Sequence, residues 1–244
     1  THFQNQRIPC KIKMLNLSER MLMAAKMVRK GNAISDIGTD HAYLPAYLVL
    51  NGISPKALAC DVRKGPLENA KKTVELYGLE EKITLRLSDG FDKIEPSEAD
   101  DFIMCGMGGT LMEQLVSRTH WLKDSKKRII VQPQSHAEDI RRYFVKNGFE
   151  ILFEDACIDS GKLYCAIAAE YTGEISEKPI SYIYSGELPK CKKNEARAYL
   201  KNISARLRKK LEAECVHGSC ENAEYLKKVT LELEETINGM QTDG

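Results

Sequence analysis

The chain has 244 residues, of which 43% are hydrophobic and 29% are charged, and its formal net charge is +1. This length fits one large domain, or one ordinary domain with an appendage. No apolar run approaches the roughly 20 residues of a membrane span, and residues 1–17 lack the apolar core of a signal peptide. We therefore expect a cytoplasmic protein that does not associate with membranes.

Eight cysteines are scattered along the chain, several of them inside apolar runs. This scatter is typical of reduced, buried thiols rather than of a disulfide framework. Cys215 and Cys220 are the only close pair in the sequence, and no Cys or His pair at zinc spacing accompanies them. We expect no metal site.

Helical and strand-like patterns alternate through residues 17–171. A helix is predicted from Leu17 to about Val28, with Ser18 as N-cap and Gly31 as the stop. Strands follow at 33–37, 57–61, 83–87, 101–105, 128–132 and 149–155, with helices near 41–51, 65–77, 109–121 and 136–147.

Residues 156–161 predict a turn, and residues 162–171 predict one more strand, antiparallel to the sheet. The result is an α/β fold, with a seven-stranded, mostly parallel sheet and the last strand reversed. This order is typical of a Rossmann-like class I methyltransferase domain.

The last third of the chain has a different pattern. Residues 172–190 carry Gly and Pro without sustained periodicity and predict a connector. Two apolar stripes at helical spacing follow in residues 191–244, separated by a reversal near 216–222. We predict a methyltransferase-like domain at 1–171, a connector at 172–190, and an antiparallel helical hairpin, a short coiled coil, at 191–244.

Acids and glycines stand where the predicted strands end. Asp36 and Asp61 end neighbouring strands, where carboxylates can hold the hydroxyls of a ribose, and Gly38 lets the backbone approach a ligand. The turn lacks the second and third glycines of G-x-G-x-x-G, which disfavours a dinucleotide pyrophosphate. A ribose cofactor without pyrophosphate fits better, and S-adenosylmethionine is the commonest. The predicted cofactor contacts are Arg20, Asp36, Gly38, Thr39, Asp40, His41, Asp61, Val62, Ser88, Asp89, Gly90 and Gly106.

Three later strand ends extend this edge. The run 88–90 can meet an adenine amino group, and the glycines of the run 105–109 let a flat ligand lie close to the backbone. Ser135 is expected to cap the helix after the fifth strand. Each motif alone fits a plain turn, and their shared position at strand ends favours a site. The predicted contacts to a substrate base are Tyr43, Met107, Gly108, Gly109 and Gln132.

The motifs at residues 17–22, 36–45, 64–70 and 106–109 make the chain resemble the bacterial tRNA adenine-N1 methyltransferase family that acts at position 22. The resemblance covers essentially the whole chain; Asp-Ile-Gly-Thr-Asp-His and Gly-Met-Gly-Gly are its distinctive parts. It implies an S-adenosylmethionine-dependent enzyme with a class I methyltransferase domain, and a C-terminal coiled coil used with tRNA.

Methylation at adenine N1 needs no covalent catalysis, because the ring nitrogen carries an in-plane lone pair. Alignment and stabilisation of the charge that develops on the base should supply most of the acceleration. Asp40 and His41 are the catalytic candidates by location. In the alternative reading, Asp40 caps the helix and His41 touches only the cofactor. Tyr43 either stacks on a flipped adenine or belongs to the core.

Two segments are strongly basic. Residues 1–30 hold seven Lys or Arg against one acid, and residues 190–210 hold nine against one. Such segments on a near-neutral protein fit a polyanion, here tRNA, although two solvated helix faces would look the same. The predicted phosphate contacts are Arg7, Lys11, Arg206, Lys209 and Lys210. For Arg20 three roles stay open: the cofactor carboxylate, a phosphate, or solvent.

Two other functions remain open from the residues. One is a nicotinamide-dependent oxidoreductase, against which the missing glycines argue. The other is a non-catalytic tRNA-binding protein, against which the intact set of Asp36, Asp61 and Asp89 argues. We expect a monomer with no obligate protein partner.

Overall fold

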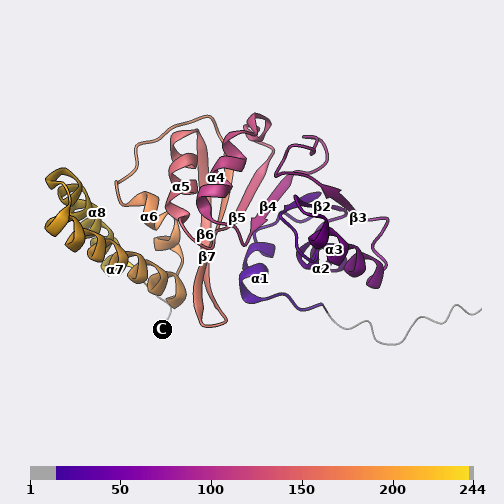
Figure 1. The fold of residues 1–244 in the computed structure, drawn as a ribbon, viewed down its shortest axis with the longest axis horizontal. Helices are drawn as coiled ribbons and strands as arrows, with labels where there is room; N and C mark the ends of the chain where they lie inside the picture. Colours follow the sequence, from indigo (N-terminus) through magenta and orange to yellow (C-terminus); the bar gives the residue numbers. More distant parts are fainter. Residues whose placement is uncertain (1–14, 242–244) are drawn as a thin grey trace, which may run out of the picture.

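The structure is a computed structural model that describes residues 15–241, so Arg7 and Lys11 lie outside the described residues. A seven-stranded sheet runs through the larger part of the molecule, in the order β3-β2-β1-β4-β5-β7-β6 (Figure 1). Its strands are β1 (Ile34–Ile37), β2 (Ala57–Asp61), β3 (Ile83–Leu87), β4 (Asp101–Cys105), β5 (Arg128–Gln132), β6 (Phe149–Asp159) and β7 (Lys162–Tyr171).

The pairing confirms the predicted sheet. Strands β1 to β5 are mutually parallel, whereas β7 is antiparallel to both β5 and β6. The strand order reverses at β1, which lies between β2 and β4. In open α/β sheets ligands bind at such a reversal, outside the carboxyl ends of the strands.

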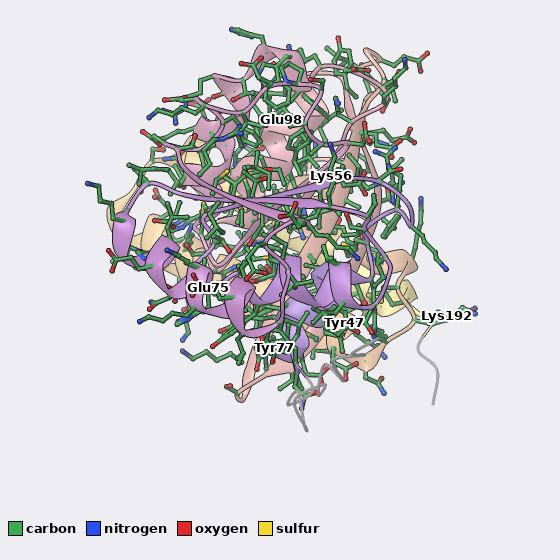
Figure 2. The ribbon with its side chains drawn as sticks, turned by 90° about the vertical axis from the view of Figure 1, so that its right-hand side faces the viewer. Tyr47, Lys56, Glu75, Tyr77, Glu98 and Lys192 are labelled. Atoms are coloured by element: carbon green, nitrogen blue, oxygen red, sulfur yellow. The ribbon has the colours of Figure 1, made fainter. Side chains whose placement is uncertain are left out.

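Helices cover both faces of the sheet. The helices of this domain are α1 (Glu19–Ala25), α2 (Tyr43–Leu50), α3 (Lys64–Leu76), α4 (Gly109–Ser117), the 3₁₀ turn η1 (His120–Leu122) and α5 (Ala137–Lys146). Successive strand residues point to opposite faces, so Ile103 packs in the core with α1, α2 and α3, and Met104 in the core with α4 and α5. Figure 2 shows α2 and α3 from the side, with Tyr47 on α2, Glu75 on α3 and Tyr77 directly after α3.

The hairpin of β6 and β7 is longer than predicted. Residues 156–159 extend β6 instead of forming a turn, because they pair with the start of β7, as in Ala156 opposite Cys165. Only Ser160 and Gly161 form the turn; both have positive φ, at 50° and 75°, as in a tight two-residue hairpin. The longer hairpin brings Asp159 to its tip.

Of the helix caps considered from the sequence, Ser18 holds its position, whereas Ser135 and Asp40 do not. Ser18 is the N-cap residue of α1, but its hydroxyl makes no capping hydrogen bond. The left-handed residues His136 and Ala42, both with φ of 52°, precede α5 and α2 instead of Ser135 and Asp40. The carbonyl of Ser135 accepts the N–H of Gly109 at 2.7 Å, because the loop after β5 folds onto the loop after β4.

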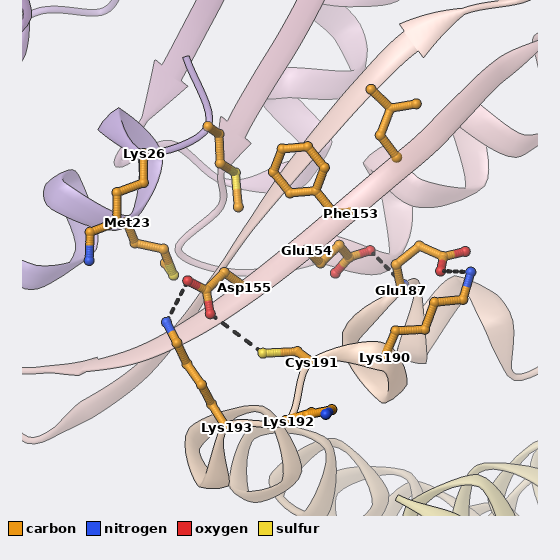
Figure 3. Close-up of a pocket in the computed structure, with 12 residues that line it drawn as sticks. Met23, Lys26, Phe153, Glu154, Asp155, Glu187, Lys190, Cys191, Lys192 and Lys193 are labelled. Atoms are coloured by element: carbon orange, nitrogen blue, oxygen red, sulfur yellow. Dashed lines mark hydrogen bonds and ion pairs between the residues drawn. The ribbon is translucent and has the colours of Figure 1, made fainter. Parts of the chain in front are cut away.

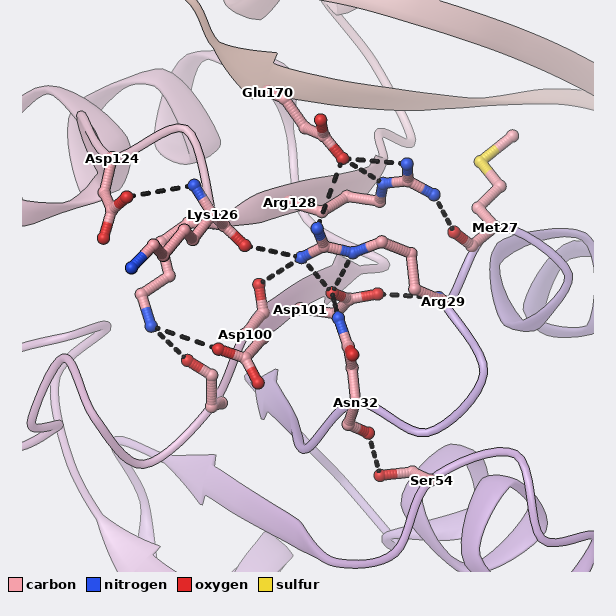
Figure 4. Close-up of polar contacts among 12 residues, drawn as sticks. Met27, Arg29, Asn32, Ser54, Asp100, Asp101, Asp124, Lys126, Arg128 and Glu170 are labelled. Atoms are coloured by element: carbon pink, nitrogen blue, oxygen red, sulfur yellow. Dashed lines mark hydrogen bonds and ion pairs between the residues drawn. The ribbon is translucent and has the colours of Figure 1, made fainter.

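The end of the α1 segment is anchored at the amino ends of β4 and β5 (Figure 4). Asp101 is fully buried and accepts hydrogen bonds from the backbone N–H of Arg29 at 2.7 Å and from its guanidinium at 2.6 and 2.8 Å. Arg128 pairs with Glu170 at 2.8 Å and donates to the carbonyl of Met27 at 3.1 Å. Arg29 therefore serves the fold, although it belongs to the basic segment 1–30.

The C-terminal helices form the predicted antiparallel hairpin, which projects at the β6 end of the sheet (Figure 1). They are α7 (Asn194–His217) and α8 (Cys220–Gly239), preceded by α6 (Tyr182–Ser185) and the 3₁₀ turn η2 (Leu188–Lys190). Their seam includes Leu200, Leu207 and Leu233 and continues onto Ala156 of β6. No helix within residues 15–241 has the length and apolar character needed to span a bilayer.

A buried ion pair joins the hairpin's base to the sheet. Arg141 of α5 and Glu154 of β6 pair at 2.6 Å with fully buried side chains. Arg141 also donates to the carbonyl of Tyr184 at 3.1 Å, and Glu154 accepts the N–H of Glu187 at 3.3 Å. Residues 172–190 thus hold the hairpin against the sheet, whereas the domain boundaries drawn from the sequence stay a prediction.

Candidate functional site

Two nearly buried carboxylates face the carboxyl edge of the sheet. Asp36 of β1 is 4% exposed and forms no ion pair with the residues that the structure describes. Burial raises its pKa to about 6, helped by the charge of Asp61 and opposed by a hydrogen bond from Thr39. Asp61 accepts the N–H of Arg63 at 2.7 Å through one oxygen. Carboxylates placed in this way can accept hydrogen bonds from a ligand's hydroxyl or ammonium groups.

Two glycine turns lie beside these acids. Gly38 and Gly106 both have φ of 80°, a left-handed conformation that side chains rarely adopt. The N–H of Gly38 donates to the carbonyl of Cys60 at 2.8 Å, and the Met107 side chain packs where a side chain on Gly38 would lie. At Gly106 a side chain would meet Arg20 and Gln134 at 3.6 Å, an ordinary contact distance. Gly106 itself is half-buried, so part of the backbone at the end of β4 faces solvent.

The end of β3 is tied into its own loop. The Ser88 hydroxyl donates to the carbonyl of Gly90 at 3.0 Å and accepts the N–H of Lys93 at 3.1 Å. Asp89 pairs with Arg118 at 2.9 Å. The hydrogen bonds of Ser88 and the ion pair of Asp89 make the loop after β3 rigid. The side chain of Val62, after β2, is exposed and supplies an apolar surface beside Asp61.

Asp40, His41 and Tyr43 line the outer rim of the site. The Nε2 atom of His41 lies 3.3 Å from a carboxylate oxygen of Asp40, and the Asp40 side chain is 67% exposed. The rings of His41 and Tyr43 stack with centroids 5.0 Å apart. A cavity of about 650 Å³ adjoins these rings and extends to Thr73 of α3. Tyr43 is half exposed and does not belong to the core.

Asp159 was not predicted from the sequence as a site residue. From the tip of the β6–β7 hairpin, its carboxylate lies 3.5 Å from the Arg20 guanidinium. Arg20 also donates to Gln132, a fully buried residue at the end of β5, at 3.1 Å. Arg20 therefore connects three segments around Gly106 and is not a free solvated cation. The only sequence signal at 159–161 was that of a turn.

The predicted tRNA contacts of the hairpin lie elsewhere. Arg206, Lys209 and Lys210 are exposed on α7 and form no ion pair within residues 15–241. The hairpin projects at the β6 end, whereas the strand-end residues surround β1, β2 and β4 (Figure 1). The structure thus separates the predicted phosphate contacts from the strand-end site.

Comparisons with known proteins agree with this architecture. Residues 17–167 match the family described as Methyltransferase domain. The chain is 37% identical over 156 residues to the tRNA (adenine(22)-N(1))-methyltransferase of Bacillus subtilis strain 168, across 64% of this chain and 66% of that protein. That alignment therefore spans just under two thirds of the relative's length.

Solved structures extend the match over most of the chain. The crystal structure of the B. subtilis M1A22 tRNA methyltransferase TrmK has a TM-score of 0.79 at 31% identity, covering 91% of this chain and 99% of that one. M. capricolum TrmK in complex with S-adenosyl-homocysteine has a TM-score of 0.77 at 26% identity, covering 92% and 99%.

The sheet order, the reversed β7 and the acids at the ends of β1 and β2 define an S-adenosylmethionine-dependent methyltransferase with a Rossmann-like class I domain. Within that class, the chain belongs to the bacterial tRNA (adenine(22)-N1)-methyltransferase family. The predicted fold, enzyme class and cofactor are thereby confirmed, and the oxidoreductase reading is set aside. The roles of individual site residues stay predictions.

Proposed function

We propose that this protein transfers a methyl group from S-adenosylmethionine to N1 of the adenine at position 22 of tRNA. The observation that carries the proposal is the pair of nearly buried carboxylates, Asp36 and Asp61, beside the half-buried, left-handed turn at Gly106. Family membership supplies the position in tRNA.

The residues at the strand ends fit the cofactor. Asp61 would hold the ribose hydroxyls, whereas Asp36 and the turn at Gly38 and Thr39 would hold the methionine portion. Asp36 lacks a cationic partner among the described residues, so a donor from the ligand would satisfy it. When bound, the cofactor supplies an electrophilic methyl group on a sulfonium.

The protein's own task is to position the base and stabilise the charge that develops on it. Asp159 and Asp40 are the two carboxylates that we propose for this role, with His41 beside Asp40 and Tyr43 and Met107 as stacking surfaces. The Asp159 side chain is 14% exposed and is held by Arg20, whereas Asp40 is 67% exposed. Because water screens exposed charges, Asp159 should contribute more.

Methyl transfer is tested with labelled cofactor and two tRNA transcripts that differ only at position 22, with adenine or guanine. We expect label only in the adenine transcript, and a reverse-transcription stop at that nucleotide because a methyl on N1 blocks base pairing. Equal labelling of both transcripts, or none of either, would contradict the proposal.

The two carboxylates are compared as Asp159→Asn and Asp40→Asn. We expect Asp159→Asn to lower kcat by about 10²-fold, as for loss of one preorganised charge-stabilising group. Asp40→Asn should have a smaller effect on kcat, and Asp159→Asn should keep its affinity for S-adenosylhomocysteine. The reverse order of kcat losses would assign the role to Asp40 and His41.

The monomeric state and tRNA binding by the hairpin remain part of this proposal.

A further inference from the structure

A second pocket lies away from the strand ends, between α1, β6 and the segment from η2 to the start of α7 (Figure 3). Its volume of about 380 Å³ is in the range of ligand pockets, about 300–1,000 Å³. None of the residues assigned above to the cofactor or the target base lines it. The pocket therefore needs an explanation of its own.

The pocket offers a planar aromatic surface. Phe153 is 40% exposed and follows a register shift in β6, between Ile151 and Phe153. The guanidinium of Arg128 lies 5.7 Å from the centroid of the Phe153 ring, and Glu170 holds that guanidinium at 2.8 Å. Met23 and Met27 of the α1 segment add an apolar wall. A ring fixed in this way suits stacking of a flat ligand.

The remaining lining is basic. Four lysines surround the pocket in Figure 3: Lys26, Lys190, Lys192 and Lys193. Lys190 pairs with Glu187 and Lys193 pairs with Asp155, whereas Lys26 and Lys192 form no ion pair within residues 15–241. The third acid of the lining, Glu154, is neutralised by Arg141. Two cations are thus left for an anionic ligand, next to a stacking surface.

The position of the pocket indicates which ligand combines these properties. Helix α1 carries Arg20 at the strand-end site, and six residues later Lys26 lines the pocket, about 9 Å further at 1.5 Å per residue. Lys193 directly precedes α7, whose exposed face carries Arg206, Lys209 and Lys210. The pocket therefore lies between the strand-end site and the basic hairpin.

We infer that this pocket binds an unpaired nucleotide of the substrate tRNA, with its base on Phe153 and its phosphates at Lys26 and Lys192. The inference rests on the proposed function, which it deepens by naming a second point of contact for the RNA. Stacking tolerates any base, so the pocket would hold the strand without selecting its sequence. It would act on tRNA affinity and leave the chemical step unchanged.

The stacking surface is tested by steady-state kinetics with Phe153→Leu and Phe153→Tyr. We expect Phe153→Leu to raise the KM for tRNA by roughly 5- to 150-fold, the range measured for loss of one stacked base, with kcat and S-adenosylhomocysteine affinity unchanged. Phe153→Tyr keeps a ring and should restore the KM. An unchanged KM in Phe153→Leu, or a fall in kcat alone, would overturn the inference.

The cations are tested separately, which also covers a Phe153→Leu variant that fails to fold. The double variant Lys26→Ala with Lys192→Ala should lower the slope of log affinity against log salt by about 1.4, at 0.7 per phosphate on single strands. The matched control, Lys82→Ala with Lys56→Ala, removes two exposed lysines near β2 and β3 and should leave the slope unchanged. Equal slopes in both double variants would overturn the inference.

The outcome also separates this inference from the proposed function. A wild-type protein that methylates no tRNA refutes the function itself. If the wild-type protein methylates tRNA and Phe153→Leu has the same KM for tRNA as wild type, only the inference about the pocket is refuted. If Phe153→Leu instead changes the oligomeric state measured by light scattering, with an unchanged KM, the pocket belongs to a second copy of the chain and the inference is wrong.

Discussion

The strand-end site and the α7–α8 hairpin differ in how their polar side chains are held. At the strand ends, Asp36 and Asp61 are nearly buried and each is fixed by its own turn. On α7, Arg206, Lys209 and Lys210 point into solvent without ion pairs in the part of the chain that is described. The first arrangement is suited to one small ligand, the second to a large polyanion whose phosphates can be met in several ways.

This difference has an energetic side. The sheet is covered by a core on each face, whereas the hairpin has a single seam and carries exposed apolar residues near its tip, among them Val216 and Tyr225. Substitutions at the strand ends should therefore affect stability or cofactor affinity strongly, one residue at a time. Substitutions of the exposed cations on the hairpin should act weakly, and only on tRNA binding.

The largest effect is expected at Gly109. A side chain there would overlap the carbonyl of His136, a backbone atom that cannot move aside, whereas at Gly108 it would lie 3.3 Å from the Ser135 hydroxyl. Gly109→Ala should lower the free energy of unfolding by about 3 kcal/mol or more. The control Gly108→Ala should cost less than about 1 kcal/mol, as measured by urea denaturation. Equal losses of unfolding free energy in the two variants would show that the loops after β4 and β5 are not closely packed at Gly109.

Asp36→Asn should stabilise the protein while it weakens cofactor binding. Burial raises the folded-state pKa of Asp36 from 3.8 to about 6, so between these values the folded state binds the proton more tightly than the unfolded state. The free energy of unfolding therefore falls as pH rises from 4 through 6, by up to about 3 kcal/mol from this group. Asp36→Asn should remove this fall and raise the Tm at pH 7 to 8 without ligand. A Tm that drops in the variant would show that the carboxylate has an unseen cationic partner.

Asp61→Ala should weaken S-adenosylhomocysteine binding by roughly tenfold to a few hundredfold, because a charge-assisted hydrogen bond contributes about 1.5–3 kcal/mol. Asp61→Asn is the matched control for structure, since an amide oxygen can still accept the N–H of Arg63. Calorimetry measures both. Unchanged affinity in a folded Asp61→Ala protein would remove Asp61 from the cofactor site.

The smallest effect is expected on the hairpin, where Arg206, Lys209 and Lys210 are changed together to Glu. The seam is untouched, so the fold should persist, and tRNA binding should weaken by roughly tenfold, at under 1 kcal/mol per exposed ion pair. The slope of log affinity against log salt should fall by about 2 to 3. A variant that binds and methylates tRNA normally would make these cations a solvated face.

Deleting residues 190–244 would not be an equally clean test. The hairpin covers Ala137 of α5 and Ala156 of β6, and residues just before it close the Arg141–Glu154 pair. Removing one side of such a buried arrangement destabilises the remainder. Loss of activity in the truncated protein would therefore not separate tRNA binding from folding, whereas the charge-reversed variant does.

The sequence by itself determined the sheet and the first half of the site. Apolar runs predicted strands β2 to β5 and β7 at their observed bounds. The reason is clearest for β2 and β4, because a parallel strand that is buried on both faces is a continuous apolar run. Strand-end positions then placed Asp36, Asp61 and Gly106 at one edge, since parallel strands end together.

Only the tertiary structure decided what the remaining polar residues do. Arg29 pairs with Asp101, Asp89 pairs with Arg118, and Arg20 contacts Gln132 and Asp159. The partners in these pairs lie 29 to 139 positions apart in the sequence. Asp159 in addition lies in a segment whose sequence predicted only a turn. The cap predicted at Ser135 failed for the same reason: the loops after β4 and β5 pair with each other and override the local preference of Ser135. Local periodicity reports which face of an element is buried, whereas the partner of a charge depends on which loops the sheet order brings together.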